Sequence, residues 1–156
     1  MPLILLGHQY CGKSTLGKHL ACKFNKPWID TDQALCAMYD QRYGKSLSCK
    51  EIFALHGDDF FRSLELEVIL KMDLQNHPVI SLGGGSLCSP SAKEYLQTKG
   101  CLLWIVCSKQ VLRTRTLQNL PAFFSGKDFE STFEKRFQER ERTFKSLQAI
   151  RIFIDR

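Results

Sequence analysis

One stretch near the start of the chain constrains the fold more than any other feature. Pro2–Leu6 is apolar throughout, Gly7–Ser14 fits the pattern G-x-x-x-x-G-K-S, and Lys13–Phe24 has apolar residues four apart. A buried strand that enters a helix through such a loop points several backbone N–H groups, and the positive end of the helix dipole, at one spot. The stretch therefore predicts a strand, a phosphate-binding loop and a helix in succession.

Short apolar segments alternate with helical segments along the rest of the chain. The expected strands are Pro2–Leu6, Pro27–Ile29, Pro78–Leu82, Cys101–Val106 and Ile150–Ile154. The expected helices are Lys13–Phe24, Gln33–Asp40, a short one capped by Ser48, Asp58–Leu74, Pro90–Gln97, one from Ser108 to Thr116, and Phe129–Leu147. This alternation predicts a three-layer α/β/α protein of the P-loop NTPase type, with a five-stranded parallel sheet. A length of 156 residues without a linker or internal repeat favours a single domain, 1–156.

Composition and charge narrow the possible partners. The chain has 24% charged and 44% hydrophobic residues, a balance typical of a globular protein and not of a disordered one. The net charge of +6 favours anionic ligands. Acidic residues interleave with the basic ones over Lys127–Lys145, so we expect a solvated helix face there and no nucleic-acid partner.

The sequence contains no recognisable signal peptide, membrane span or metal-binding pattern. No apolar run is long enough for a signal peptide or a membrane span, and a strand that begins almost at Met1 leaves no room for a targeting segment. The seven cysteines are odd in number, no two are three apart, and the four histidines lack metal-ligand spacing. We therefore expect a reduced, cytoplasmic protein without a zinc site, a disulfide framework or a membrane partner.

The loop pattern predicts a site for a nucleoside triphosphate. Lys13 can reach the β- and γ-phosphates, and the Ser14 hydroxyl can bind Mg²⁺. The residues expected to contact ATP are Gly7, Tyr10, Cys11, Gly12, Lys13, Ser14 and Thr15. The alternative is a glycine-rich turn with a chance Lys-Ser pair, which the flanking strand and helix disfavour.

Two acidic residues follow the second expected strand. Asp30 and Asp32 are two apart, so on an extended chain both carboxylates point toward one cleft at the carboxyl edge of the sheet. Beside Mg·ATP, one carboxylate can support the metal while the other accepts a proton from an acceptor hydroxyl. A helix N-cap with one solvated acid explains the same spacing equally well.

Two further features surround a possible acceptor site. Glu65 lies three residues after Arg62 and can orient it as a planar fork for a carboxylate or phosphate, although a surface ion pair is the commoner arrangement. Gly83–Gly85 allows a ligand to approach the backbone closely, or makes a tight connection. The phenylalanines of Phe129–Leu147 are spaced as core residues.

Together these motifs resemble the shikimate kinase family of small P-loop kinases. The resemblance rests on the loop through Thr15, D-T-D at Asp30–Asp32, I-F-A-x-x-G-D-x-x-F-R-x-x-E at Ile52–Glu65, S-L-G-G-G at Ser81–Gly85 and R-x-x-x-F at Arg140–Phe144. In the family the last motif usually ends in Tyr. The family transfers the γ-phosphate of ATP to the 3-hydroxyl of shikimate, on the route to chorismate and the aromatic amino acids.

The resemblance implies roles for individual residues on the ATP side. Lys13 would hold the phosphates and act in catalysis. Ser14 and Asp30 would serve Mg²⁺, and Arg113 would lie by the adenine.

On the acceptor side, the resemblance makes Asp32 the group that binds the acceptor hydroxyls and acts as base or orienting residue. Arg62 and Arg140 would clamp the shikimate carboxylate, and Gly84 would meet shikimate through its backbone. Residues 32–62 would form the acceptor-binding segment and Leu117–Lys127 the lid. We expect a monomer whose partners are the two small substrates.

Two positions depart from the family pattern. The family normally has Arg directly before the lid proline, whereas Leu120 precedes Pro121 here. An arginine that approaches the transferred phosphoryl group is worth about 10³–10⁵ in rate, so its absence matters. Arg115 or Lys127 could substitute for it if the lid folds differently. Tyr10 stands where the family usually has a small Gly, which requires its side chain to point outward.

Two other interpretations stay open. A kinase of the same fold could use another acceptor, such as gluconate or a nucleotide, although a nucleotide acceptor calls for more arginines in the lid. A non-catalytic module that binds shikimate or nucleotide agrees with Leu120, but not with the presence of Lys13, Ser14 and both aspartates.

Overall fold

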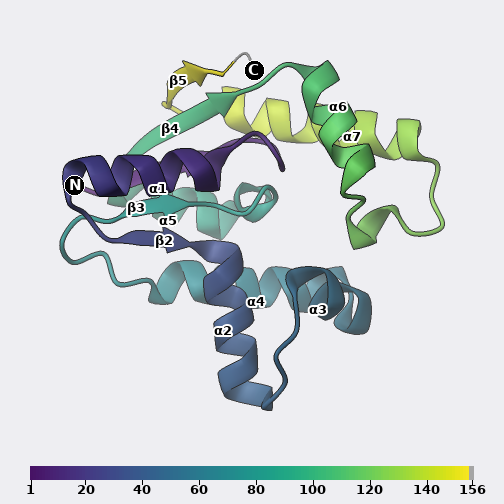
Figure 1. Ribbon diagram of the computed structural model, residues 1–156, viewed down its shortest axis with the longest axis horizontal. Helices are drawn as coiled ribbons and strands as arrows, with labels where there is room; N and C mark the ends of the chain where they lie inside the picture. Colours follow the sequence, from purple (N-terminus) through teal and green to yellow (C-terminus); the bar gives the residue numbers. More distant parts are fainter. Residues whose placement is uncertain (155–156) are drawn as a thin grey trace.

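The computed structural model describes residues 1–154, and these residues are built around one sheet. Within them, five strands run in the order β2-β3-β1-β4-β5, and every neighbouring pair is parallel (Figure 1). The strands are β1 (Leu3–Leu6), β2 (Trp28–Asp30), β3 (Val79–Ser81), β4 (Cys101–Val106) and β5 (Ile150–Phe153). Because β1 lies between β3 and β4, the connections diverge at its carboxyl end, which is where open α/β sheets bind ligands.

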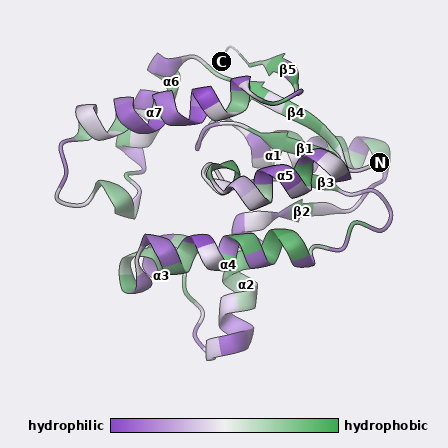
Figure 2. Cartoon of the chain, turned by 180° about the vertical axis from the view of Figure 1, so that it is seen from behind, coloured by the Kyte–Doolittle hydropathy of each residue, from purple (hydrophilic) through white to green (hydrophobic). Residues whose placement is uncertain are grey.

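Helices cover both faces of the sheet. They are α1 (Lys13–Phe24), α2 (Thr31–Tyr43), α3 (Cys49–His56), α4 (Asp58–Lys71), α5 (Pro90–Lys99), α6 (Lys109–Gln118) and α7 (Phe129–Lys145), with the short 3₁₀ helices η1 (Ser86–Cys88) and η2 (Ala122–Phe124). Residues of α1 and α6 pack against one face, residues of α4 and α5 against the other, and α7 contributes to both. Figure 2 shows the hydrophobic strands β1 and β4 among helices that carry both hydrophobic and hydrophilic residues.

Successive residues of β1 face opposite layers, as a strand buried on both sides requires. Ile4 and Leu6 belong to the cluster with Ile80 and Leu96, whereas Leu5 belongs to the cluster with Ile105. The two buried layers hold β1 in register with its neighbours. They therefore fix the position of the loop that follows it.

A third hydrophobic cluster lies beside the sheet. It joins α2, α3 and α4 through buried side chains of Leu35, Tyr39, Ile52, Phe61, Leu64 and Val68. Figure 1 shows α2 and α3 projecting from the β2 side of the sheet. This cluster holds the 32–62 segment together and places both of its ends at the carboxyl edge.

The predicted fold class is confirmed, and the differences lie at the ends of elements. The helix expected from Gln33 begins at Thr31, because Asp30 caps it. The helix expected to reach Leu74 ends at Lys71, since Met72 has extended backbone angles. The segment Leu117–Lys127, predicted as a mobile loop, contains the 3₁₀ turn η2.

The aromatic face of α7 is core, as its spacing predicts. Phe133 and Phe144 are buried, and the Phe133 ring lies 5.7 Å from that of Phe129 and 6.1 Å from that of Phe137. Among the helices of residues 1–154, none combines the length and the apolar character that a membrane span needs.

Candidate functional site

Gly7–Ser14 forms a tight loop between β1 and α1. Gly7 has φ +149°, and a Cβ at this position would lie 2.7 Å from the backbone oxygen of Ile105. Gly12 has φ +95° and caps α1, so both glycines of the pattern occupy conformations that side chains disfavour. Tyr10 adopts φ +64° without being glycine.

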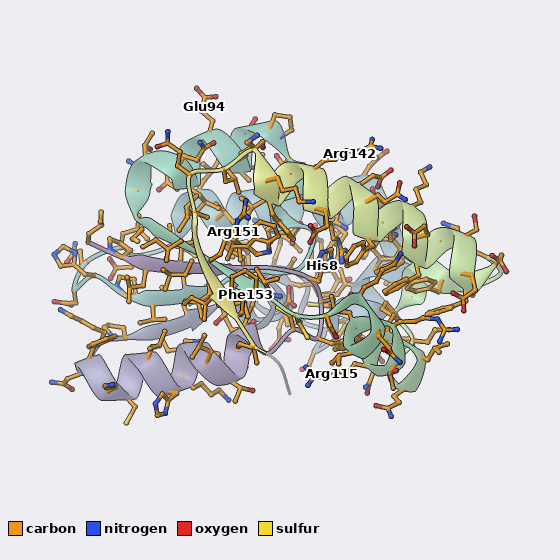
Figure 3. The ribbon with its side chains drawn as sticks, turned by 90° about the horizontal axis from the view of Figure 1, so that it is seen from above. His8, Glu94, Arg115, Arg142, Arg151 and Phe153 are labelled. Carbon is orange, nitrogen blue, oxygen red and sulfur yellow. The ribbon has the colours of Figure 1, made fainter. Side chains whose placement is uncertain are left out.

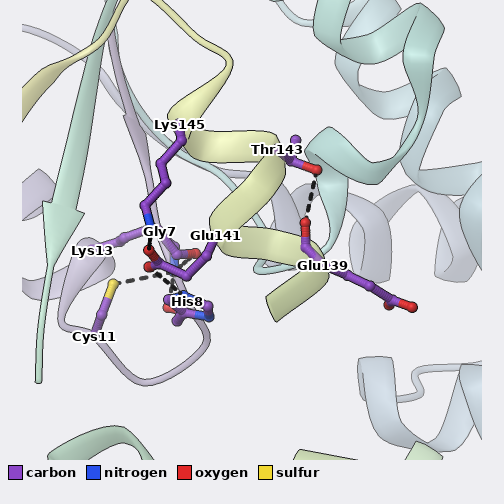
Figure 4. A network of polar contacts seen from close by, with 8 residues as sticks. All are labelled: Gly7, His8, Cys11, Lys13, Glu139, Glu141, Thr143 and Lys145. Atoms are coloured by element: carbon purple, nitrogen blue, oxygen red, sulfur yellow. Dashed lines mark hydrogen bonds and ion pairs between the residues drawn. The ribbon is translucent and has the colours of Figure 1, made fainter. Parts of the chain in front are cut away.

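Lys13 lies under the loop. Its Nζ donates hydrogen bonds to the backbone oxygens of Gly7 at 3.0 Å and His8 at 2.6 Å (Figure 4). A Sγ contact to Cys11 at 3.6 Å completes the set. The side chain is buried, so a cation is held inside the curve of the loop, where it can attract phosphate oxygens.

His8 connects the loop to α7. Its ring stacks on Phe137 with 4.5 Å between centroids, and Nε2 lies 3.1 Å from Glu141 Oε1 (Figure 4). Burial, chiefly, lowers the pKa of His8 to about 4, although the hydrogen bond to Glu141 opposes the shift. The ring is therefore neutral at physiological pH and donates its Nε2–H to Glu141.

Ser14 and Asp30 meet at the start of the two helices. The Ser14 hydroxyl donates to Asp30 Oδ2 at 2.6 Å, while Asp30 Oδ1 accepts from the backbone N–H groups of Asp32 and Gln33. Asp30 therefore caps α2, as one interpretation of the Asp30–Asp32 spacing predicted, and its other carboxylate oxygen also faces the loop. A hydroxyl and a carboxylate are the oxygen ligands that Mg²⁺ prefers, so this pair fits the metal.

Two cavities meet at the carboxyl edge of the sheet. The first, which we call the loop cleft, has a volume of about 1230 Å³ and lies over residues of the phosphate loop. The second, the side cavity, has a volume of about 460 Å³ and lies among α3, α4 and Leu117–Lys127. Their common wall is formed by Gln9, Tyr10, Asp32, Gly84 and Asn119. Groups held in the two cavities can therefore meet beside this wall.

Asp32 is the carboxylate of that common wall, and it is the group there best suited to accept a proton. Its side chain is open to the cleft, yet the surrounding walls replace much of its bulk water. This desolvation, followed by the negative charges of Asp30 and Glu65, raises the pKa of Asp32 to about 6. Such a carboxylate is ionised at neutral pH and is a better proton acceptor than an ordinary aspartate.

Arg62 lies at the far wall of the side cavity. Its Nη1 donates to Glu65 Oε2 at 2.7 Å, and its Nε lies 3.4 Å from Asp58. Glu65 is buried and also accepts from the Ser86 hydroxyl at 2.7 Å, so it is held from two sides. A Cβ on Gly85 would lie 2.5 Å from Arg62 Nη1. The guanidinium therefore occupies space that is open only because residue 85 is glycine.

Arg140 reaches the same cavity from α7. Its side chain is buried, and within residues 1–154 no carboxylate lies within ion-pair distance of it. Burial lowers the pKa of Arg140 to about 10. A Cβ on Gly84 would lie 3.3 Å from its Nη1. Arg62 and Arg140 thus present positive charge to one cavity whose floor is the glycine run.

Three basic residues named from the sequence lie in different surroundings. Arg113 forms an exposed ion pair with Glu130 at the start of α7 and does not line the loop cleft. Arg115, labelled in Figure 3, does line it. Its Nη1 donates to the Tyr10 carbonyl at 2.9 Å. Lys127 is exposed and lines neither cavity. Of the two candidates to replace a lid arginine, only Arg115 reaches the cleft.

Tyr10 bridges the loop to the start of the lid. Its hydroxyl donates to the Asn119 carbonyl at 2.5 Å. Burial and the charge of Asp32 raise the pKa of Tyr10, so the hydroxyl stays protonated. The tyrosine that replaces the family's glycine therefore extends away from the loop toward α6, as its tolerance requires.

The lid rests on both α3 and α7. The Phe123 ring lies 6.3 Å from that of Phe53, and the Arg136 guanidinium lies 3.7 Å from the Phe123 centroid. Leu120 and Pro121 line the side cavity. The lid thus covers the side cavity with apolar side chains, and a cation–π contact from Arg136 fixes the Phe123 ring of the lid.

Sequence reasoning missed His8, Arg136 and Cys49 as neighbours of the site. His8 and Arg136 act through partners more than 10 positions away along the chain, so no local spacing marks them. Cys49 lines the side cavity but stands in a segment whose only recognisable signal is the Ser48 cap.

Comparisons with known proteins agree with this geometry. The shikimate kinase family model matches residues 10–155. A shikimate kinase of Staphylococcus aureus (strain JH9) is 32% identical over 114 residues, which cover 73% of this chain and 62% of that protein. The chain thus spans less than two thirds of the length of this relative.

Solved structures extend the likeness to the whole fold. Shikimate kinase from Aquifex aeolicus has a TM-score of 0.79 and 27% identity, covering 98% of this chain and 86% of that one. The Acinetobacter baumannii shikimate kinase in complex with shikimate has a TM-score of 0.83 and 21% identity, covering 100% and 85%, and shows the shared fold alone. With the family match over nearly its full length, the chain belongs to the shikimate kinase family.

Proposed function

We propose that this protein transfers the γ-phosphoryl group of ATP to the 3-hydroxyl of shikimate. The observation that carries the proposal is the wall containing Asp32 and Gly84, which separates a phosphate-loop cleft from a cavity bearing two arginines. One side suits a nucleotide, and the other suits a small polyol that carries an acidic group.

The arginines support shikimate as the acceptor. Arg140 is a buried cation without an ion-pair partner in residues 1–154, and Arg62 is held in a fixed orientation by Glu65. Together they would bind a carboxylate in bidentate fashion. The backbone of Gly84 would approach the ring of the acceptor closely, since no side chain lies between them.

The loop cleft supports ATP and Mg²⁺ as the donor pair. Lys13 would exchange its bonds to the loop carbonyls for bonds to the β- and γ-phosphates, and Ser14 with Asp30 would hold Mg²⁺ directly or through water. When bound, Mg²⁺ neutralises charge on the phosphates. Tyr10, Cys11, Gly12 and Thr15 line the same cleft, and Arg113 would reach the adenine only after leaving Glu130.

Asp32 would act on the acceptor hydroxyl. Its carboxylate would orient the 3-hydroxyl and accept its proton as the oxygen bonds to the γ-phosphorus and the bond to ADP breaks. Because the two cavities share Asp32, the reacting atoms would meet without a large movement of either substrate. Closure of the 117–127 lid over the 32–62 segment would exclude water.

We further propose that residues 1–156 act as one kinase domain, as a monomer in the cytoplasm. The common sheet and the continuous clusters around it support a single unit. The net charge is spread over interleaved acidic and basic residues, which supports small anionic substrates over nucleic acid.

A coupled assay for ADP tests the activity. We expect turnover that requires both shikimate and Mg²⁺, and a shikimate 3-phosphate product by mass spectrometry. Gluconate and nucleoside monophosphates, the acceptors of the alternative kinases, serve as comparison substrates. Folded protein that shows no shikimate-dependent ADP release would refute the activity.

Leu120 favours one second candidate, a module that binds shikimate without phosphorylating it. Leu120 lines the side cavity directly before the lid proline, and as an apolar residue it supplies no positive charge at the position where the family has arginine. Calorimetric binding of shikimate without turnover would support this candidate and exclude the first.

A further inference from the structure

Two cysteines outside the proposed chemistry lie in contact. The Sγ atoms of Cys36, in the middle of α2, and Cys49, the first residue of α3, are 3.4 Å apart. Both are free thiols and both are partly exposed. A disulfide has an S–S distance of about 2.05 Å, so the sulfurs need to approach by only roughly 1.4 Å more.

The connection between the two helices permits that approach. α2 ends at Gly44 in a left-handed conformation, and the residues from Gly44 to Ser48 are almost entirely exposed. Within this short connection only Leu47 packs against the third hydrophobic cluster, and it does so partly buried, so the first turn of α3 can shift against α2. The pair is thus both close and adjustable.

The two thiols differ in their chemistry. The hydrogen bond from Cys49 lowers the pKa of Cys36, whereas that bond and burial raise the pKa of Cys49. Cys36 is therefore the thiol that supplies a nucleophilic thiolate, and Cys49 is the thiol that resolves the oxidised product.

Cys49 also touches the candidate site. It lines the side cavity, and its Sγ lies 3.4 Å from the backbone oxygen of Asp32, which is an alternative acceptor for its single S–H. Moving this sulfur toward Cys36 removes that contact at the first turn of α2. Neither Cys36 nor Cys49 lines the loop cleft.

We propose that Cys36 and Cys49 form a reversible oxidation site for a peroxide-class oxidant, and that their disulfide weakens acceptor binding while leaving nucleotide binding intact. The second half of this proposal rests on the proposed function, because it takes shikimate as the ligand of the side cavity.

The chemistry balances with hydrogen peroxide as oxidant. The Cys36 thiolate attacks one peroxide oxygen, an S–O bond forms, the O–O bond breaks, and hydroxide leaves to take up a proton. Cys49 sulfur then attacks Cys36 Sγ, so an S–S bond forms and the S–O bond breaks. The leaving hydroxide takes the Cys49 proton as water. In total two thiols are oxidised and one peroxide is reduced to two waters.

The test oxidises the full chain with hydrogen peroxide and then removes the excess. Intact mass and non-reducing peptide maps are expected to show loss of two hydrogens and a Cys36–Cys49 crosslink. Calorimetry is expected to show shikimate binding weakened by about tenfold or more, with ADP binding unchanged, and dithiothreitol is expected to restore the affinity. Cys36→Ser should bind shikimate like the reduced protein but resist the effect of oxidant, while Cys22→Ser, at an exposed site on α1, should respond like the parent.

The outcomes separate the two halves of the proposal. Oxidation of Cys22 without a Cys36–Cys49 crosslink would overturn the oxidation site. A crosslink that leaves shikimate affinity unchanged, or that weakens ADP binding equally, would overturn its effect on the site. If reduced protein binds no shikimate at all, the proposed function fails, while the crosslink still reports on the oxidation site by mass.

Discussion

Asp32 and Glu65 converge on the point where Gly83 lacks a side chain. A Cβ there would lie 2.7 Å from Asp32 Oδ1 and 2.8 Å from Glu65 Oε1. The first glycine of the run thus leaves room for two carboxylates that come from different helices. Their proximity contributes to the raised pKa of Asp32.

Gly83→Ala is expected to disturb this arrangement more than the fold. The added methyl group would push flexible side-chain ends and not backbone, so the protein should remain folded. Displacing Asp32 by a fraction of an ångström should lower kcat/KM for shikimate by about 10²-fold, with little change in ADP affinity by calorimetry. Equal losses for both ligands would contradict this local explanation.

Asp32→Asn is expected to reduce activity and raise stability at neutral pH. Losing a general base lowers kcat by roughly 10²–10⁴-fold. The pKa of Asp32 is raised to about 6 from its ordinary 3.8, so the folded state binds more protons between these values and loses stability as pH rises through them. Thermal unfolding at pH 8 should show the variant as more stable than the parent, and the difference should vanish near pH 4.

The same pKa predicts a pH profile for the proposed activity of the parent protein. We expect kcat/KM for shikimate to fall as pH drops below about 6, because Asp32 becomes protonated in the protein without bound substrate. A flat profile through this range would show that Asp32 does not accept the proton.

Arg140→Met is expected to weaken shikimate binding and to raise the thermal stability of the protein. Removing a hydrogen-bonding cation should weaken shikimate binding by about 10–100-fold, while relief of an unpaired buried charge should raise the melting temperature. Arg142→Met, at an exposed position on the same helix, is the matched control and should change neither property. Unaltered shikimate affinity in Arg140→Met would remove this residue from the site.

His8 predicts acid sensitivity of the loop. Its pKa falls to about 4 in the folded protein, so between about 6.5 and 4 the unfolded state binds more protons and the folded state loses stability as pH falls. The contribution is on the order of 1 kcal/mol per pH unit at most. Denaturant unfolding of His8→Asn should show a shallower decline over this range than the parent.

Leu120→Arg tests the missing lid arginine. The side chain of residue 120 lines the side cavity, so an arginine there could reach the transferred phosphoryl group. We expect kcat to rise by about tenfold or more if chemistry limits the rate. Leu117→Arg, exposed on α6 and outside both cavities, should leave kcat unchanged.

The fold was largely predictable because its signals are local. The apolar strands, the serine and aspartate caps and the loop pattern each depend on residues within a few positions of one another. The end of α4 was harder, since Met72 and Leu74 continue the apolar pattern and pack on the core after the helix has ended.

The candidate site was predictable in its residue types more than in their partners. Asp32 and Arg62 could be assigned to one crevice, and both line the side cavity. The bond between Arg62 and Glu65 was predictable from their spacing on one helix. The bond from Ser86 that fixes Glu65 comes from an element distant in sequence, and no local pattern marks it. The lid contact between Arg136 and Phe123 likewise joins segments that no spacing rule relates.

Tyr10 connects the phosphate loop to the lid segment Leu117–Lys127. Its backbone is held by Arg115 and its hydroxyl by Asn119, so neither end can shift without pulling on the other. A phosphate that displaced the loop would therefore also displace Asn119, which lies inside the lid segment Leu117–Lys127. In this chain the tyrosine that stands in place of the family's glycine therefore couples the phosphate loop to α6 and the lid through two hydrogen bonds.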